Sequence, residues 1–198
     1  MMRVMEQIEA GLWRWTAPHP DWRPARKKDS ASDWPREVGC VAAELGSELV
    51  LIDPLVDGEA QWTWLDERAA GRAVHVLQTI AWHKRSRDEV LERYGDRADR
   101  LAPEGVETIR VAGVRENVFW LAGYGALVPG DTLIGDGAGG VRMCPESWLG
   151  YAKPRVGHAE LRAALAPVLH LPVERVLLSH GEPVVAGGAA ALRRALAA

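Results

Sequence analysis

The stretch that most constrains the fold is an apolar, strand-like run that ends at Thr79 and is followed by a short turn and a helix beginning at Ser86. The turn carries three side chains able to bind a ligand, Trp82, His83 and Arg85. Open α/β folds place their chemistry outside the carboxyl ends of strands, where a strand passes into a turn and a helix. The pattern therefore predicts an α/β protein with a site at this strand end.

Two later apolar runs end in the same way, on a polar residue beside glycine. Residues 127–131 (Leu-Val-Pro-Gly-Asp) end on Asp131, and residues 176–181 (Val-Leu-Leu-Ser-His-Gly) end on His180 and its glycine. Because functional groups gather at the carboxyl edge of such sheets, we expect these two ends and the turn after Thr79 to form the walls of one site.

Composition places the chain among ordinary globular proteins. Its 198 residues are 47% hydrophobic, which is enough for a sizeable core, and we expect a single domain over residues 1–198. The net charge of -3 is too small to favour a nucleic-acid or membrane-surface partner. Cys40 and Cys144 stand alone, and no stretch is apolar enough to cross a bilayer. These features indicate a reduced, cytoplasmic protein that acts on a small molecule, with homo-oligomerisation left open.

The expected elements are strands, a strand–helix unit, strands again, and then helix, strand and helix. One or two strands are expected over residues 3–17, with Gly11 at a turn or bulge, and further strands over 38–44, 48–52, 74–79, 107–111, 117–121, 126–128, 132–134 and 176–178. Helices are expected over 59–70, 86–94 (closed by Gly95), 158–169 and 188–196. Residues 18–36 contain four prolines and form a long loop, which we expect to cover the site. This order predicts two mixed β-sheets packed on each other and flanked by helices, an αββα sandwich.

Three local patterns and their order resemble the metallo-β-lactamase fold superfamily. Residues 51–54 (Leu-Ile-Asp-Pro) look like the end of its early hairpin, and residues 130–133 (Gly-Asp-Thr-Leu) look like its Gly-Asp motif, whose aspartate bridges two metal ions. Residues 178–181 (Leu-Ser-His-Gly) look like the segment with its late histidine. The resemblance covers most of the chain. It implies the αββα fold, a metal-dependent hydrolase, and catalytic, metal-ligating roles for Asp131 and His180.

The chain departs from the superfamily at its signature, Thr-His-x-His-x-Asp-His. Matched without a gap, the four ligand positions hold residues that are not usual zinc ligands, Ile80, Trp82, Lys84 and Arg85. With one inserted residue, His83 replaces the second histidine. The middle histidine of the superfamily should lie near residues 111–117, which contain no histidine. The resemblance thus leaves at most three metal ligands, His83, Asp131 and His180.

Three donors restrict the metal chemistry. A two-metal centre needs more ligands than these, and the positive charge of Arg85 would repel a second cation. Two histidines and one carboxylate suit a single zinc or iron(II) ion. His19, which lies in a proline-bounded part of the long loop, is the expected replacement ligand if a further donor is present.

Two functions are left open by these residues. In the first, the two-metal centre is lost or reduced, to one ion or none, and the pocket binds a small, anionic molecule, because an arginine fork matches a carboxylate or phosphate. The ligand-binding residues would be Trp82, His83, Arg85 and His19. In the second, one ion lowers the pKa of water for hydrolysis of an ester, thioester or phosphoester. Its ligands would be His83, Asp131 and His180.

Overall fold

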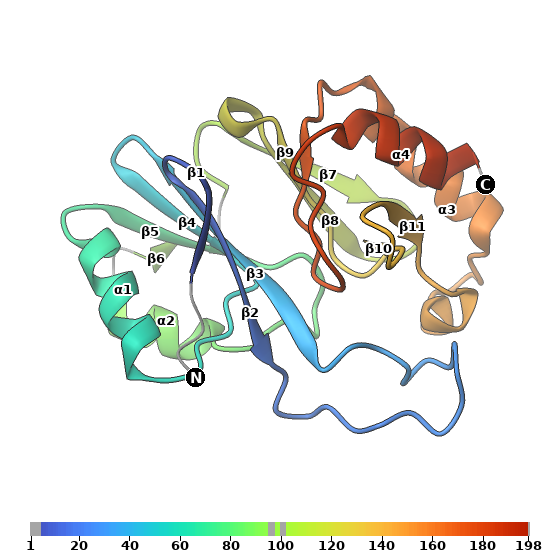
Figure 1. Cartoon of the computed structure of the whole chain (residues 1–198), viewed down its shortest axis with the longest axis horizontal. Helices are drawn as coiled ribbons and strands as arrows, with labels where there is room; N and C mark the ends of the chain where they lie inside the picture. The colour runs from blue at the N-terminus through green and yellow to red at the C-terminus, as the bar shows by residue number, and fades with distance from the viewer. Residues whose placement is uncertain (1–4, 95–97, 100–101, 198) are drawn as a thin grey trace.

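The computed structural model describes residues 5–94, 98–99 and 102–197 and consists of two β-sheets packed face to face, with helices on both outer faces (Figure 1). Two helices cover the first sheet and two cover the second. The helices are α1 (Glu59–Ala69), α2 (Arg87–Tyr94), α3 (His158–Leu165) and α4 (Gly188–Ala197). This arrangement confirms the predicted αββα sandwich.

The first sheet comes from the N-terminal half and mixes antiparallel and parallel pairs. Its strands, in spatial order, are β1 (Glu6–Glu9), β2 (Leu12–Pro18), β3 (Glu37–Leu45), β4 (Glu48–Ile52), β5 (Ala73–Leu77) and β6 (Ala98–Asp99). β1 to β4 pair antiparallel, which confirms the predicted turn at Gly11 and the early hairpin. β4, β5 and β6 run parallel, with Ile52 opposite Leu77. This register brings the carboxyl ends of β4 and β5 side by side.

The second sheet comes from the C-terminal half. Its strands, in spatial order, are β12 (Arg175–Val176), β9 (Ala126–Val128), β8 (Glu116–Leu121) and β7 (Val106–Val111), with a 3₁₀ helix, η2 (Ala122–Tyr124), between β8 and β9. A separate hairpin of β10 (Leu133–Gly135) and β11 (Val141–Met143) encloses a glycine-rich loop over residues 136–140. β11 is not among the predicted strands. β12 ends at Val176 rather than at Leu178 as predicted.

The two faces of each sheet bury different side chains, as the period-two alternation of a strand requires. Along β4, Leu49 and Leu51 pack toward α1 and α2, whereas Val50 and Ile52 face the second sheet. From the other side, Phe119 of β8 enters the same layer between the sheets. The first sheet therefore borders two apolar layers, one beneath α1 and α2 and one between the two sheets.

One helix differs from its predicted bounds. The helix expected over residues 158–169 ends as α3 at Leu165 and continues as a 3₁₀ helix, η4 (Ala166–His170). Pro167 explains the change, because proline lacks the N–H group that α-helical pairing needs. Gly95, the predicted end of α2, lies outside the described residues. Among the helices of the described ranges, none has both the length and the apolar character that crossing a bilayer requires.

The loop over residues 18–36 connects β2 to β3, and its irregular structure confirms the prediction. In Figure 1 it extends away from the first sheet toward the C-terminal half. A 3₁₀ helix, η3 (Glu146–Leu149), fastens it there through two side chains that donate to main-chain carbonyls of the loop. These hydrogen bonds run from Ser147 Oγ to Asp29 O and from Trp148 Nε1 to Ser30 O (3.1 Å).

Candidate metal centre

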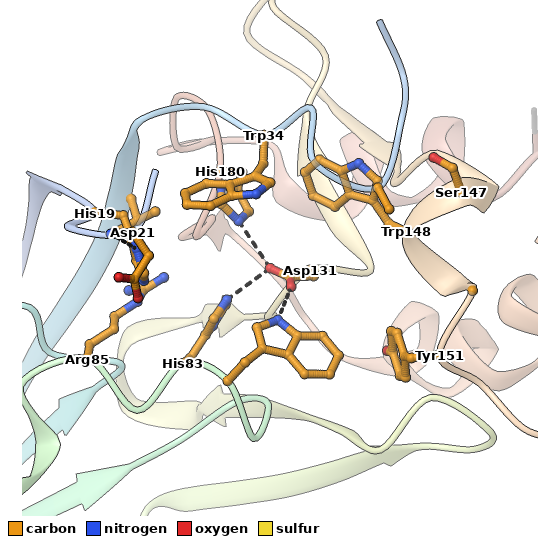
Figure 2. A pocket seen from close by; sticks show the side chains of 14 residues that line it. His19, Asp21, Trp34, His83, Arg85, Asp131, Ser147, Trp148, Tyr151 and His180 are labelled. Carbon is orange, nitrogen blue, oxygen red and sulfur yellow. Dashed lines mark hydrogen bonds and ion pairs between the residues drawn. The ribbon is translucent and has the colours of Figure 1, made fainter. Parts of the chain in front are cut away.

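Three predicted residues meet at one edge of the sandwich, where His83 follows β5, Asp131 follows β9 and His180 follows β12 (Figure 2). The Nε2 atoms of His83 and His180 lie 3.0 Å and 3.1 Å from the same carboxylate oxygen, Asp131 Oδ1. One ligand atom from each residue lies within 4.8 Å of the other two. The three strand ends are thus brought together, as the sequence predicts.

His83 is held from behind by a buried carboxylate. His83 Nδ1 lies 2.8 Å from Asp53 Oδ2, and both side chains are buried. Asp53 Oδ1 accepts the main-chain N–H of Thr79 (2.9 Å), and the Thr79 hydroxyl donates to Asp53 Oδ2. A carboxylate that accepts Nδ1–H from a histidine fixes the tautomer whose Nε2 lone pair is free. Asp53 therefore directs Nε2 of His83 toward Asp131.

Asp131 is held mainly through its backbone. The buried Glu116 side chain on β8 accepts the N–H groups of Gly130 (3.0 Å), Asp131 (2.9 Å) and Thr132 (2.9 Å), and also the Thr132 hydroxyl (2.6 Å). On the cavity side, Trp82 Nε1 donates to Asp131 Oδ2 (2.7 Å). These contacts leave Oδ1 of Asp131 facing the two histidines.

His180 lies where the chain after β12 passes against β10. Its carbonyl oxygen accepts the N–H of Gly135 (2.9 Å). Gly181 has a φ of 92°, and a Cβ atom there would lie 2.9 Å from Cα of Gly135, so only glycine fits. The buried Arg14 of β2 donates to the carbonyls of Leu178 (3.1 Å) and Gly181 (2.8 Å). The backbone is thus fixed on both sides of His180.

Electrostatics distinguishes the two histidines. Burial opposes protonation of His83, but the carboxylates of Asp131 and Asp53 outweigh it and raise the His83 pKa to about 9. Burial lowers the pKa of His180 despite its contact with Asp131. Burial alone would raise the pKa of Asp131, yet the neighbouring histidines hold it well below its usual range. At neutral pH, the metal-free cluster therefore carries its proton on His83, between two carboxylates.

The geometry fits a metal ion. Within the described residues, no hydrogen-bond donor is well aligned with the buried Asp131 Oδ1, although two ring nitrogens lie close to it. A cation among these three atoms would satisfy the oxygen and both ring nitrogens at once. Zinc and iron(II) accept two histidines and one carboxylate as ligands. The group of His83, Asp131 and His180 could therefore hold one metal ion.

Two positions of the superfamily's signature, Ile80 and Lys84, do not face this point. Ile80 is 2% exposed and buried in the core, and Lys84 is exposed and forms an ion pair with Asp88 (2.5 Å). In the part of the chain that the structure describes, there is a single group of three candidate metal ligands. A second ion of the superfamily type therefore has no set of three ligands among these residues.

Arg85 lies beside the cluster, but most of its guanidinium is committed to the protein. Nη1 donates to the carbonyls of Gly39 (2.7 Å) and Asp53 (2.8 Å), and Nη2 donates to Ser179 Oγ (2.7 Å). A bidentate grip on an anion needs two parallel N–H groups from the fork. Because both Nη1 protons are already used, Arg85 joins three chain segments rather than presenting a free fork.

A cavity of about 520 Å³ opens beside the cluster, a size typical of sites for small molecules. Four aromatic side chains line it, one from the long loop, one from the turn after β5, one from η3 and one just beyond η3. They are Trp34, Trp82, Trp148 and Tyr151. His19, the expected replacement ligand, also lines the cavity, packed edge-on against Trp34 at 5.2 Å between ring centroids. It is not part of the group of three ligands.

The sequence alone does not predict the roles of the two carboxylates that support the cluster, Asp53 and Glu116. Nor does it predict most of the aromatic side chains that line the cavity. Asp53 carries a usable signal, because it directly follows an apolar strand at the sheet edge where Thr79 also lies. Glu116 carries none, since it stands between two ordinary polar residues. In sequence, Trp34 and Trp148 look the same as tryptophans that pack in the core.

Comparison with solved protein structures identifies proteins with the same fold. The sequence matches no family model and no curated protein. A metallo beta lactamase structure from Hirschia baltica is 14% identical, with a TM-score of 0.66 and 98% of this chain and 96% of that chain covered. A metallo-beta-lactamase from Pontibacter korlensis is 15% identical, with a TM-score of 0.64 and 99% and 98% covered. The DIM-1 metallo-beta-lactamase, in a structure exposed to ceftazidime, is 14% identical, with a TM-score of 0.64 and 98% and 95% covered. At this identity, the likeness establishes the fold.

Proposed function

Because the chain has the metallo-β-lactamase fold, we propose that it is a divergent, metal-dependent hydrolase with a single-ion centre at His83, Asp131 and His180. Its substrate is a small ester, thioester or phosphoester bound in the cavity beside the cluster. The second metal position of the superfamily is lost, because side chains such as Ile80 and Lys84 occupy the signature and point elsewhere.

The observation that carries the proposal is the convergence of His83 Nε2 (3.0 Å) and His180 Nε2 (3.1 Å) on one buried oxygen, Asp131 Oδ1, with neither ring nitrogen well aligned for a hydrogen bond. In the metal-free protein the charge of a protonated His83 balances this carboxylate. A divalent cation would instead bind the oxygen and both ring nitrogens at once. Three ligands also leave a coordination position open, as hydrolytic zinc sites do.

The chain's own residues prepare this point. Asp53 accepts a hydrogen bond from His83 Nδ1–H, so that Nε2 is the nitrogen that would bind an ion once its own proton has left. Trp82 holds Asp131 Oδ2, so that Oδ1 is the oxygen turned inward. When bound, a divalent ion would supply Lewis acidity, which lowers the pKa of water and polarises a substrate oxygen. The aromatic walls limit the water that surrounds the substrate.

A second candidate is a binding protein that holds no metal. It is favoured by the charge balance of the cluster, because a protonated His83 already pairs with Asp53 and Asp131. In that case the cavity binds a small molecule without chemistry. The two candidates differ in metal content, which is directly measurable.

The test is elemental analysis of the protein purified without chelator, beside His180→Ala and the control His170→Ala. His170 is exposed at the end of η4, so its loss should leave metal content unchanged. We expect about one equivalent of zinc or iron in the parent and control, and loss of the ion and of esterase or thioesterase activity in His180→Ala. Metal-free parent protein, or hydrolysis that His180→Ala leaves intact, would overturn the hydrolase and favour the binding protein.

A further inference from the structure

The aromatic walls of the cavity present ring faces rather than free hydrogen-bonding groups. The polar atoms of three rings are already bonded within the protein. Trp82 Nε1 donates to Asp131 Oδ2 (2.7 Å), Trp148 Nε1 to Ser30 O (3.1 Å) and Tyr151 OH to Val114 O (2.8 Å). Because these polar atoms already form hydrogen bonds within the protein, a ligand contacts the apolar faces and edges of the rings.

The rings lie close to the ligand cluster. Figure 2 shows the indoles of Trp34 and Trp148 on one side of Asp131. Trp82 contacts Asp131 through the hydrogen bond from its Nε1 (2.7 Å). Trp82 meets Tyr151 edge-to-face at 4.6 Å between ring centroids, and Trp148 meets His180 in the same way at 5.4 Å. The hydrogen bonds and ring contacts hold these walls in place before a ligand arrives, which lowers the entropy lost on binding.

Trp82 is unusually exposed for so large an apolar side chain. It is 48% exposed, and within the described residues only Val185 is another large hydrophobic side chain classed as exposed. Because Trp82 lines the cavity, its exposed ring surface is available to a ligand there. The cavity also offers no free arginine fork, because both Nη1 protons of Arg85 bind backbone carbonyls, Nη2 donates to Ser179 Oγ, and Nε is buried. The walls therefore favour a flat, uncharged group over an anionic one.

We propose that the substrate carries a flat, neutral aromatic group, held among the rings of Trp34, Trp82 and Trp148 that line the cavity, next to the bond that is hydrolysed. This inference rests on the proposed function for the reacting bond. For an aryl-substituted ester, the acyl carbon–oxygen bond breaks and the oxygen of water bonds to the acyl carbon. One proton passes to the departing oxygen, giving a carboxylic acid and an alcohol.

Binding is tested without catalysis by calorimetric titration with three probes: N-methyl-2-phenylacetamide, which is neutral and aromatic, N-methylbutanamide, which is neutral and aliphatic, and phenylacetate, which is anionic. We expect the aromatic amide to bind about tenfold more tightly than the aliphatic one. Equal affinity of the two amides would overturn the inference, and so would tighter binding of phenylacetate to the metal-free protein.

Two substitutions at one position separate ring faces from loop anchoring. Trp148→Leu and Trp148→Phe both lose the hydrogen bond to Ser30, but only the second keeps an aromatic face. We expect Trp148→Leu to lose the tenfold preference for the aromatic amide, and Trp148→Phe to keep most of it. Equal loss in both variants would assign Trp148 to loop anchoring and overturn its part in recognition.

A hydrolysis assay distinguishes failure of this inference from failure of the proposed function. Acid release from methyl phenylacetate and methyl butanoate is followed at constant pH, with the metal content of each sample measured. We expect kcat/KM to be about tenfold higher for the aromatic ester. Equal turnover of both esters would overturn the proposed aromatic specificity but would still support the proposed hydrolase. Tight binding of the aromatic amide by a protein that holds no metal and hydrolyses neither ester would support the aromatic specificity and overturn the hydrolase.

Discussion

The two halves of the molecule hold their metal ligands by different means. In the N-terminal half, Asp53 touches the ligand side chain itself, through Nδ1 of His83. In the C-terminal half, Glu116 bonds no atom of the Asp131 side chain and instead gathers main-chain N–H groups of residues 130–132. Support of a side chain sets both its orientation and its proton, whereas support of the backbone sets position alone. The proton of the metal-free site lies on His83 in the N-terminal half, where the carboxylates of Asp131 and Asp53, one from each half, together raise its pKa.

Removing the side-chain support should have the largest effect. Asp53→Ala leaves the buried N–H of Thr79 without its acceptor, and leaves His83 Nδ1 and the Thr79 hydroxyl with only each other (3.0 Å) in place of the carboxylate. We expect the free energy of unfolding to fall by about 3–5 kcal/mol and metal affinity to fall by roughly 10–100-fold. Urea unfolding and metal titration measure the two effects. Asp88→Ala, at an exposed ion pair, is the control and should change neither. Unaltered metal affinity in Asp53→Ala would show that His83 needs no such support.

Weakening the backbone support should have a smaller effect on the metal. Glu116→Gln keeps the shape of the side chain but replaces one acceptor oxygen with an NH₂ group facing N–H donors. We expect a loss of about 1–3 kcal/mol in the free energy of unfolding. Metal affinity should fall less than in Asp53→Ala, because the Asp131 carboxylate keeps its contact with Trp82. If metal affinity fell as much in Glu116→Gln as in Asp53→Ala, support of the backbone and support of the side chain would matter equally for metal binding.

Metal binding should displace a proton from the N-terminal half. The His83 pKa of about 9 lies above its ordinary value of 6.5, so the metal-free protein holds this proton at pH 7. Binding at pH 7 should release about one proton, and apparent affinity should rise with pH until about 9. Calorimetry in two buffers with different ionisation enthalpies counts the protons released. No release at pH 7 would contradict the assignment.

The same raised pKa makes the stability of the metal-free protein depend on pH. The folded state binds the His83 proton more tightly than the unfolded state, so this contribution is complete below about pH 6.5 and is lost as pH rises through about 9. His83→Gln should remove this dependence. His180→Gln should keep it, because burial lowers the pKa of His180 and no proton is stored there near neutral pH.

The smallest effect is expected at the cysteines, one in each half. Cys40 and Cys144 are both buried, and burial raises the pKa of both thiols, that of Cys144 to about 12. Since the thiolate is the reactive form, neither should be alkylated in the native protein at neutral pH. Intact-mass analysis after iodoacetamide treatment, with and without urea, counts the labelled thiols. Native labelling of Cys144 alone would show that the C-terminal half opens more readily.

Much of the fold and the ligand set can be predicted because the signals are local. Alternation predicts the early hairpin, and each of the three ligands follows an apolar run, so chain order alone places His83, Asp131 and His180 at strand ends. The supporting contacts cannot be predicted in this way. Asp53 and His83 are 30 positions apart, and they meet only because β4 and β5 pair in parallel. Such contacts depend on sheet register, which no single segment encodes.

The loop over residues 18–36 is fastened to η3 through its own carbonyl groups at positions 29 and 30. Every amino acid supplies a carbonyl, so the closure needs no particular side chain to make these two bonds, although the φ of 55° at Asp29 favours Asp, Asn or Gly at that position. Substitutions elsewhere along the loop can therefore accumulate without removing these two bonds to the C-terminal half. Related chains could exchange the residue at position 34, and with it the preferred substrate, while the ligand cluster below stays the same. The loop is a place where selectivity can evolve separately from the reaction.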